Sequence, residues 1–150
     1  TITGYAGDVM EPFCAPDGTL CYNPRNGAGE RPELRYATRT PSGGLVDRGV
    51  VRGTESALLN GVPSIDRARE LFFISPRSYD TTLETMYTAR YAVGRAYDVH
   101  PVTGLAAPKR GIVCFDADIS ADGQRLLISE GTSDATGGLH GDPRRSSSLR

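Results

Sequence analysis

The chain has 150 residues, a length that fits one ordinary domain with a sizeable core. Its 18 glycines and 10 prolines make up about a fifth of the residues, against ~12 % in an average protein, which argues against long bundled helices. A hydrophobic content of 38%, a charged content of 23% and a net charge of −1 exclude a disordered chain, a membrane-spanning protein and a basic surface for nucleic acid. The first residue is Thr1, so we expect a processed piece from which any export signal has already been removed.

A repeat of about 51 residues organises the chain. Sliding the sequence against itself by that offset gives nine identities over 42 positions, where unrelated sequences would give roughly three. The matched pairs are Pro12 with Pro63, Leu20 with Leu71, Glu33 with Glu84, Tyr36 with Tyr87, Arg39 with Arg90, Gly43 with Gly94, Asp47 with Asp98, Val51 with Val102 and Gly53 with Gly104. We expect copies near residues 12–62, 63–113 and 114–131 onward, followed at 132–150 by a polar tail that is disordered or used for docking.

Each copy opens with a predicted hairpin. Asp17-Gly18 and Asp122-Gly123 lie between short apolar stretches, which indicates a β-hairpin because both residue types tolerate the positive φ of tight turns. The second copy has Ala68-Arg69 instead, which weakens its turn. The strand after the turn is apolar on both faces, as residues 71–74 and 126–128 show. A solvated strand would alternate apolar with polar residues, so these strands predict sheets stacked face to face.

Two further strands are expected in each of the first two copies, over residues 33–39 and 46–52, and over 84–90 and 97–103. Four short strands in about 50 residues match a β-propeller blade. The predicted fold is therefore all-β, a propeller or a segment of one with four-stranded antiparallel blades. A helix over 82–97 competes and would give a small mixed α/β domain, but the matching segment at 33–39 runs directly into a Pro-Ser-Gly-Gly turn.

The hairpin motif resembles a known family. Residues 118–129 read Asp-Ile-Ser-Ala-Asp-Gly-Gln-Arg-Leu-Leu-Ile-Ser, and with the degenerate copies from Pro12 and Pro63 they are similar to the repeats of TolB-like, WD-repeat-like β-propellers. Such propellers serve as periplasmic interaction modules, as accessory domains of peptidases and occasionally as enzymes acting on sugars, so the resemblance implies a fold more than a chemistry. Closed propellers have four to eight blades. The chain would then be an excerpt of a longer propeller, half of a ring that a second copy completes, or an open array capped by its own tail.

The cysteines are Cys14, Cys21 and Cys114. Counting outward from the first turn places Cys14 opposite Cys21, and directly opposed residues can reach disulfide distance. Alternatively both are small core residues, because their repeat equivalents are apolar. Cys114 is expected to be a buried hydrophobic residue. No second Cys/His pair has ligand spacing, so neither a metal nor another cofactor is expected.

Carboxylates offer the best enzymatic case. Asp116 and Asp118 are two residues apart, so on one strand face they could act as an acid/base pair or bind a ligand, or they could accept hydrogen bonds from turn amides at the blade rim. Arg77 lies in the loop after the second hairpin and could meet a ligand carboxylate or remain a solvated charge. The chain has no zinc-peptidase, nucleophile-elbow or phosphate-loop motif, so no catalytic residue is assigned.

These patterns predict a non-enzymatic binding scaffold in an exported, periplasmic or secreted, setting. Its partner would be a protein or a small ligand, and not nucleic acid or a membrane. The alternative is a propeller enzyme, or the accessory domain of an enzyme, that acts on carbohydrate through Asp116 and Asp118. A second copy of the chain is a further candidate partner because it would complete a ring.

Overall fold

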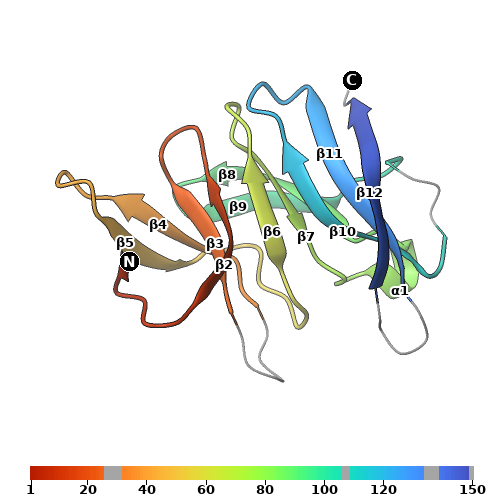
Figure 1. Ribbon diagram of the computed structural model, residues 1–150, viewed down its shortest axis with the longest axis horizontal. Helices are drawn as coiled ribbons and strands as arrows, with labels where there is room; N and C mark the ends of the chain where they lie inside the picture. Colours follow the sequence, from red (N-terminus) through yellow and green to blue (C-terminus); the bar gives the residue numbers. More distant parts are fainter. Residues whose placement is uncertain (26–31, 106–108, 134–138, 149–150) are drawn as a thin grey trace.

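The computed structural model describes residues 1–25, 32–105, 109–133 and 139–148, with only the backbone described for 133 and 139–148. These residues have an all-β fold with a single short helix. The strands form three sheets that follow one another along the chain, and Figure 1 shows the sheets side by side.

The first sheet has the strand order β1-β5-β4-β3-β2. Its strands are β1 (Ile2–Thr3), β2 (Val9–Cys14), β3 (Leu20–Pro24), β4 (Arg35–Arg39) and β5 (Leu45–Val50). The second sheet consists, in order, of β6 (Gly61–Ile65), β7 (Glu70–Ile74), β8 (Met86–Ala92) and β9 (Arg95–Pro101). The third consists of β10 (Ile112–Ile119), β11 (Arg125–Ser133) and β12 (Leu139–Ser148). All neighbouring strands are antiparallel except β1, which pairs in parallel with β5.

The predicted strands are confirmed with small shifts of their ends. Asp17-Gly18 joins β2 to β3, and Asp122-Gly123 joins β10 to β11. The expected third strands are β4 and β8, and the expected fourth strands are β5 and β9. The helical alternative over 82–97 is wrong, because β8 and β9 occupy these residues and helix α1 spans only Tyr79–Thr82.

A strand lies where a polar tail was expected. β12 pairs with β11 from the Ser133↔Leu139 pair to the Arg125↔Ser148 pair. Backbone pairing at the edge of a sheet does not need apolar side chains, and the register shifts next to Pro143, where a missing N–H is tolerated. The remainder of the expected tail, residues 134–138 and 149–150, lies outside the described residues.

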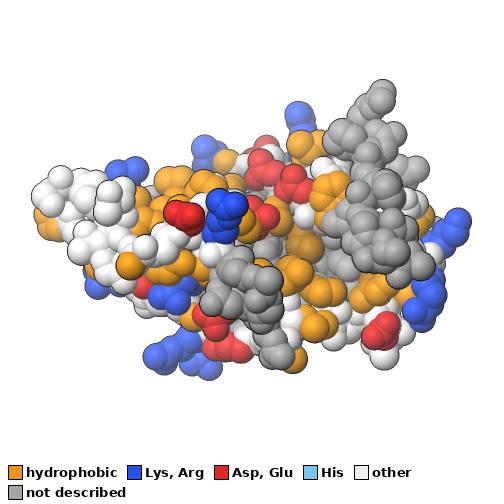
Figure 2. Space-filling model, turned by 60° about the horizontal axis from the view of Figure 1, so that its bottom comes forward, with side chains coloured by type: hydrophobic (Ala, Val, Ile, Leu, Met, Phe, Trp, Pro, Cys, Tyr) orange, Lys and Arg blue, Asp and Glu red, His pale blue; other side chains and the backbone are white. Residues whose placement is uncertain are grey.

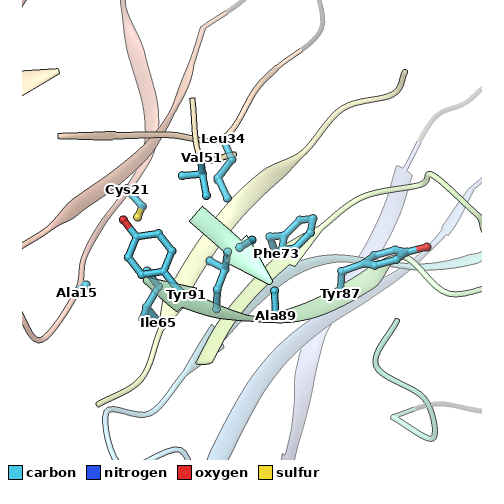
Figure 3. Close-up of a cluster of buried hydrophobic side chains, with 11 residues drawn as sticks. Ala15, Cys21, Leu34, Val51, Ile65, Phe73, Tyr87, Ala89 and Tyr91 are labelled. Atoms are coloured by element: carbon cyan, nitrogen blue, oxygen red, sulfur yellow. The ribbon is translucent and has the colours of Figure 1, made fainter. Parts of the chain in front are cut away.

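Strand β7 is buried on both faces, as its sequence predicts. Leu71 and Phe73 belong to an apolar cluster between the first and second sheets, which also contains Cys21 and Val51 (Figure 3). Phe72 and Ile74 belong to a cluster with β10 and β11 of the third sheet. The four β7 side chains are at most 6% exposed. The second sheet therefore lies between the other two, with apolar contacts on both sides.

The three hairpin tips lie next to one another, along the top of Figure 1. Arg69 forms an ion pair with Asp17 of the first tip, with 3.7 Å between Nη2 and Oδ2. The Arg67 N–H donates to the carbonyl oxygen of Ala121 in the third tip at 2.9 Å. Asp17, Asp66 and Asp122 each accept a hydrogen bond from a backbone N–H of their own turn. Carboxylates thus accept hydrogen bonds from turn amides here, but these carboxylates are not Asp116 and Asp118, the pair offered for that role from the sequence.

Arg69 occupies the position at which the first tip has glycine. Its φ of 67° compares with 84° at Gly18, and both turns are closed by the same hydrogen bond, Asp66 N–H to Glu70 O and Ala15 N–H to Thr19 O. The second copy thus keeps its turn although its sequence lacks Asp-Gly, because the neighbouring tips hold Arg69 in a conformation that costs a non-glycine residue about 1 kcal/mol.

We expect Arg69→Gly to be more stable to urea than Arg69→Ala by about 1 kcal/mol, because both variants lose the ion pair and only glycine relieves the backbone. The comparison therefore separates the backbone effect from the lost charge. Equal free energies of unfolding in the two variants would contradict a strained turn.

Candidate functional site

The first strands of the three sheets, β2, β6 and β10, are neighbours in space, and β6 contacts both of the others. Each lies at the end of its sheet, so one of its edges pairs with no other strand among the described residues. Each also contains a register shift: Met10 to Phe13 in β2, Gly61 to Ser64 in β6, and Cys114 to Asp116 in β10. Such bulges bend an edge strand and hinder its pairing with another chain.

The bulges of β2 and β6 hold two residues in a strained conformation. Glu11 has a φ of 50° and Val62 a φ of 52°, and the two residues are equivalent in the sequence repeat. Positive φ costs a non-glycine residue about 1–3 kcal/mol and is particularly unfavourable for a β-branched valine. Each is followed by a proline, Pro12 or Pro63, a residue that edge strands accept at bulges. This proline match is the sequence feature that could have indicated the bulges.

The side chains of Glu11 and Asn23 hold the bulge of β6 in place by accepting hydrogen bonds from its backbone. The Val62 N–H donates to Glu11 Oε2 at 2.9 Å and to Asn23 Oδ1 at 3.2 Å. Asn23 is fully buried, and its Nδ2 donates to the carbonyl oxygens of Glu33 at 2.8 Å and Asn60 at 2.6 Å. Asn23 thus joins β3 to the segments that precede β4 and β6. No sequence pattern indicates this role, because all its partners are backbone groups.

An apolar groove opens at these bulges, at the end of the molecule opposite the hairpin tips. Its volume is about 360 Å³, and small-ligand sites typically measure ~300–1,000 Å³. Figure 2 looks toward this end and shows hydrophobic side chains gathered over the middle of the face. The lining residues come from all three sheets and are Met10, Glu11, Pro32, Leu59, Gly61, Val62, Ile74, Pro76, Thr85, Val113, Cys114 and Phe115. Among the residues that the structure describes, Glu11 is the only charged one in this lining.

Exposed apolar side chains extend the groove onto the surface. Met10 and Leu59 line it and are 37% and 42% exposed. Their chain neighbours Val9 and Leu58 are exposed to a similar degree. Large apolar side chains that remain accessible around one groove indicate a surface that binds something.

Arg77 lies behind the groove, and its guanidinium group makes its contacts inside the protein. Its guanidinium lies over the rings of Phe73 and Tyr87, with 5.3 Å and 5.0 Å between Cζ and the ring centroids. Nη2 donates to the Thr54 carbonyl at 2.6 Å and to Asn60 Oδ1 at 2.7 Å. Burial lowers the pKa of Arg77, as expected for a cation withdrawn from water. The expectation of a solvated loop charge is therefore wrong, and the proposed contact with a ligand has to compete with these bonds.

Asp116 and Asp118 lie together on β10, opposite Ser129 and Leu127 of β11. Both are exposed, on the face of the third sheet that points away from the second, because the alternating Ala117 is buried. Burial, and then the charge of Asp116, raise the pKa of Asp118. Neither residue lines the apolar groove. The shared face is confirmed, whereas a ligand role for the pair stays a prediction.

The predicted pairing of Cys14 with Cys21 is wrong. Gly18 has a φ of 84° and closes a three-residue loop, so Ala15 pairs with Thr19, Cys14 with Leu20 and Phe13 with Cys21. This one-residue slip places the two thiols on opposite faces of the sheet, and both are free. The alternative interpretation, that both are core residues, is confirmed for Cys21 and wrong for Cys14, which is exposed. Burial raises the pKa of Cys21 to about 12.

Cys114 is half-buried and lines the groove, where we expected a fully buried residue. Its backbone is held by Thr85, whose hydroxyl donates to the Cys114 carbonyl at 2.6 Å and accepts from the Cys114 N–H at 3.0 Å. The bulge of β10, like that of β6, is therefore fixed by a side chain of a neighbouring strand or loop and not by a strand ladder.

Within the described ranges, no three His, Cys, Asp or Glu side chains come together in a way that could hold a metal ion. The one helix described is too short to span a membrane. Comparison with protein families, characterised proteins and solved structures finds no match to this chain.

Proposed function

We propose that the chain is a non-enzymatic binding module of the β-propeller type, acting in an exported setting, and that the apolar groove holds its ligand or protein partner. The observation that carries this proposal is the groove itself. Three bulged strands, two strained residues and several exposed apolar side chains meet there. Strain and exposed apolar surface both cost stability, so their coincidence at one cavity favours a binding role.

The arrangement of the sheets supports the propeller part of the proposal. Antiparallel meanders follow one another along the chain and stack through apolar clusters, and their first strands are neighbours. In a propeller the first strands of the blades would surround the central channel, and the groove would lie at the mouth of that channel.

Ring completion by a second copy has less support at the first sheet. Tyr5 packs edge-on against Tyr22 at 5.5 Å between ring centroids, and β1 extends this sheet beyond β5. The N-terminal segment thus covers part of the face that a further blade would need. A ring closed by a second copy would need this face as well as the third sheet.

A carbohydrate-acting enzyme is the second candidate. The raised pKa of Asp118 beside Asp116 is what one expects of a general acid next to a base. Neither residue lines the apolar groove, which weakens this candidate. Asp116→Asn with Asp118→Asn, tested for turnover against a panel of glycans, decides it. Loss of turnover in a folded variant would favour the enzyme over the scaffold.

The groove is tested with N-phenyl-1-naphthylamine, a neutral apolar dye that fluoresces when it leaves water. We expect the native chain to bind the dye, and Leu59→Glu to weaken binding about tenfold, because a charge then lies in the apolar lining. Leu127→Glu is the matched control, since Leu127 is an exposed leucine of β11 that does not line the groove. Failure of the native chain to bind, or equal loss in both variants, would overturn the proposal.

A further inference from the structure

The carboxylate of Glu11 is held at a fixed place in the groove. Its Oε2 accepts the Val62 N–H at 2.9 Å. A Cβ added to Gly61 would approach the same oxygen to 3.1 Å, so the missing side chain at Gly61 leaves space for the carboxylate over β6. Glu11 also has a positive φ, which belongs to the bulge of β2 and sets the direction of the backbone there. Glu11 is exposed, and this hydrogen bond keeps its carboxylate beside the apolar lining.

This charge is open to a ligand. No Lys, Arg or His of the described residues forms an ion pair with Glu11. A carboxylate has about four acceptor sites, and the Val62 N–H occupies one of them. Apolar side chains including Met10, Val113 and Phe115 line the space around it. The described lining thus sets the negative charge of Glu11 beside apolar side chains, an arrangement that complements a cation with an apolar body.

The bulges favour a small molecule over a peptide strand. A peptide that adds to a sheet edge needs a regular row of donors and acceptors, and the register shifts at Glu11 and Val62 interrupt that row. The volume of about 360 Å³ suits a compact ligand.

We propose that the groove binds a small organic cation whose ammonium group contacts the Glu11 carboxylate while its apolar body lies between β2, β6 and β10. This inference rests on the proposed binding function and specifies the ligand class.

Three probes with the same apolar body test it: 4-phenylbutylammonium, 4-phenylbutanol and 4-phenylbutanoate. By titration calorimetry we expect the ammonium to bind about tenfold more tightly than the alcohol, and the carboxylate to bind most weakly. Glu11→Gln should abolish the preference for the ammonium and leave the alcohol unchanged, because a glutamine oxygen can still accept the Val62 N–H. Asp8→Asn, which removes an exposed charge outside the groove lining, should change nothing.

Equal binding of the ammonium and the alcohol, tightest binding of the carboxylate, or an unchanged preference in Glu11→Gln would overturn the inference and leave the binding function intact. Failure of all three probes to bind would count against the binding function as well. Thermal unfolding followed by circular dichroism confirms that the Glu11→Gln chain is folded before its affinities are compared.

Discussion

Replacing Gly53 by alanine is expected to lower the free energy of unfolding by about 3 kcal/mol or more, because the new Cβ both overlaps the backbone and strains its own residue. Gly53 has a φ of 88°, and the Cβ would lie 2.2 Å from the carbonyl oxygen of Ala96. The Ala96 backbone cannot easily withdraw, since its N–H donates to Arg52 O at 2.7 Å. Here the segment after β5 docks against β9, through the parallel bridge of Arg52 with Arg95.

The sequence repeat supplies the control. Gly104 is the repeat equivalent of Gly53, has a φ of 81°, and a Cβ there would meet no atom of the described residues within 4 Å. We expect Gly104→Ala to cost only the backbone strain of about 1 kcal/mol. Urea unfolding measures the free energy of unfolding of both variants. The difference between their losses reports only the close approach of the new Cβ at position 53 to the Ala96 backbone. Similar losses in the two variants would mean that the segment after β5 does not lie against β9 as described.

The second large effect is expected at Asn23. Asn23→Leu keeps the branched shape of the side chain but removes three hydrogen bonds, and it leaves the buried carbonyl group of Asn60 and the partly buried carbonyl group of Glu33 without that donor. Each unsatisfied buried group costs about 1–3 kcal/mol, so we expect a loss of about 3–5 kcal/mol in the free energy of unfolding. We also expect the variant to bind the dye more weakly at denaturant concentrations where it is still folded. The reason is that Glu11 alone then accepts the hydrogen bond of the Val62 N–H.

Thr54→Val is the matched control for Asn23. Thr54 is equally buried, and its hydroxyl makes one hydrogen bond, to the Val51 carbonyl at 2.8 Å. We expect this isosteric change to cost about 1 kcal/mol. If the two variants were equally stable, the hydrogen bonds of Asn23 would not be what joins β3 to the neighbouring segments.

Much of the fold can be predicted from local signals. The Asp-Gly turns locate two hairpins, and the doubly apolar β7 sequence predicts cover on both faces, because these features depend on residues adjacent in the chain. The register of the first hairpin could not be predicted by counting outward from the turn. The loop length depends on Gly18 taking a positive φ, and a one-residue change in the loop moves every side chain to the other face.

The candidate site is less predictable for a physical reason. Its residues act through backbone partners of other segments: Asn23 through Glu33 and Asn60, and Glu11 through Val62. A backbone partner leaves no mark in the sequence at its own position. The matching prolines after Glu11 and Val62 could have marked these strands as irregular, but a proline does not indicate a groove.

The double burial of β7 has a consequence for how the molecule unfolds. With Leu71 and Phe73 against the first sheet and Phe72 and Ile74 against the third, strand β7 has no face in contact with water. Loss of either neighbour would expose an apolar face of the second sheet, which then favours association with whatever apolar surface is nearby. The groove is assembled from strands of all three sheets, so the binding surface and the cooperativity of unfolding depend on the same contacts between sheets.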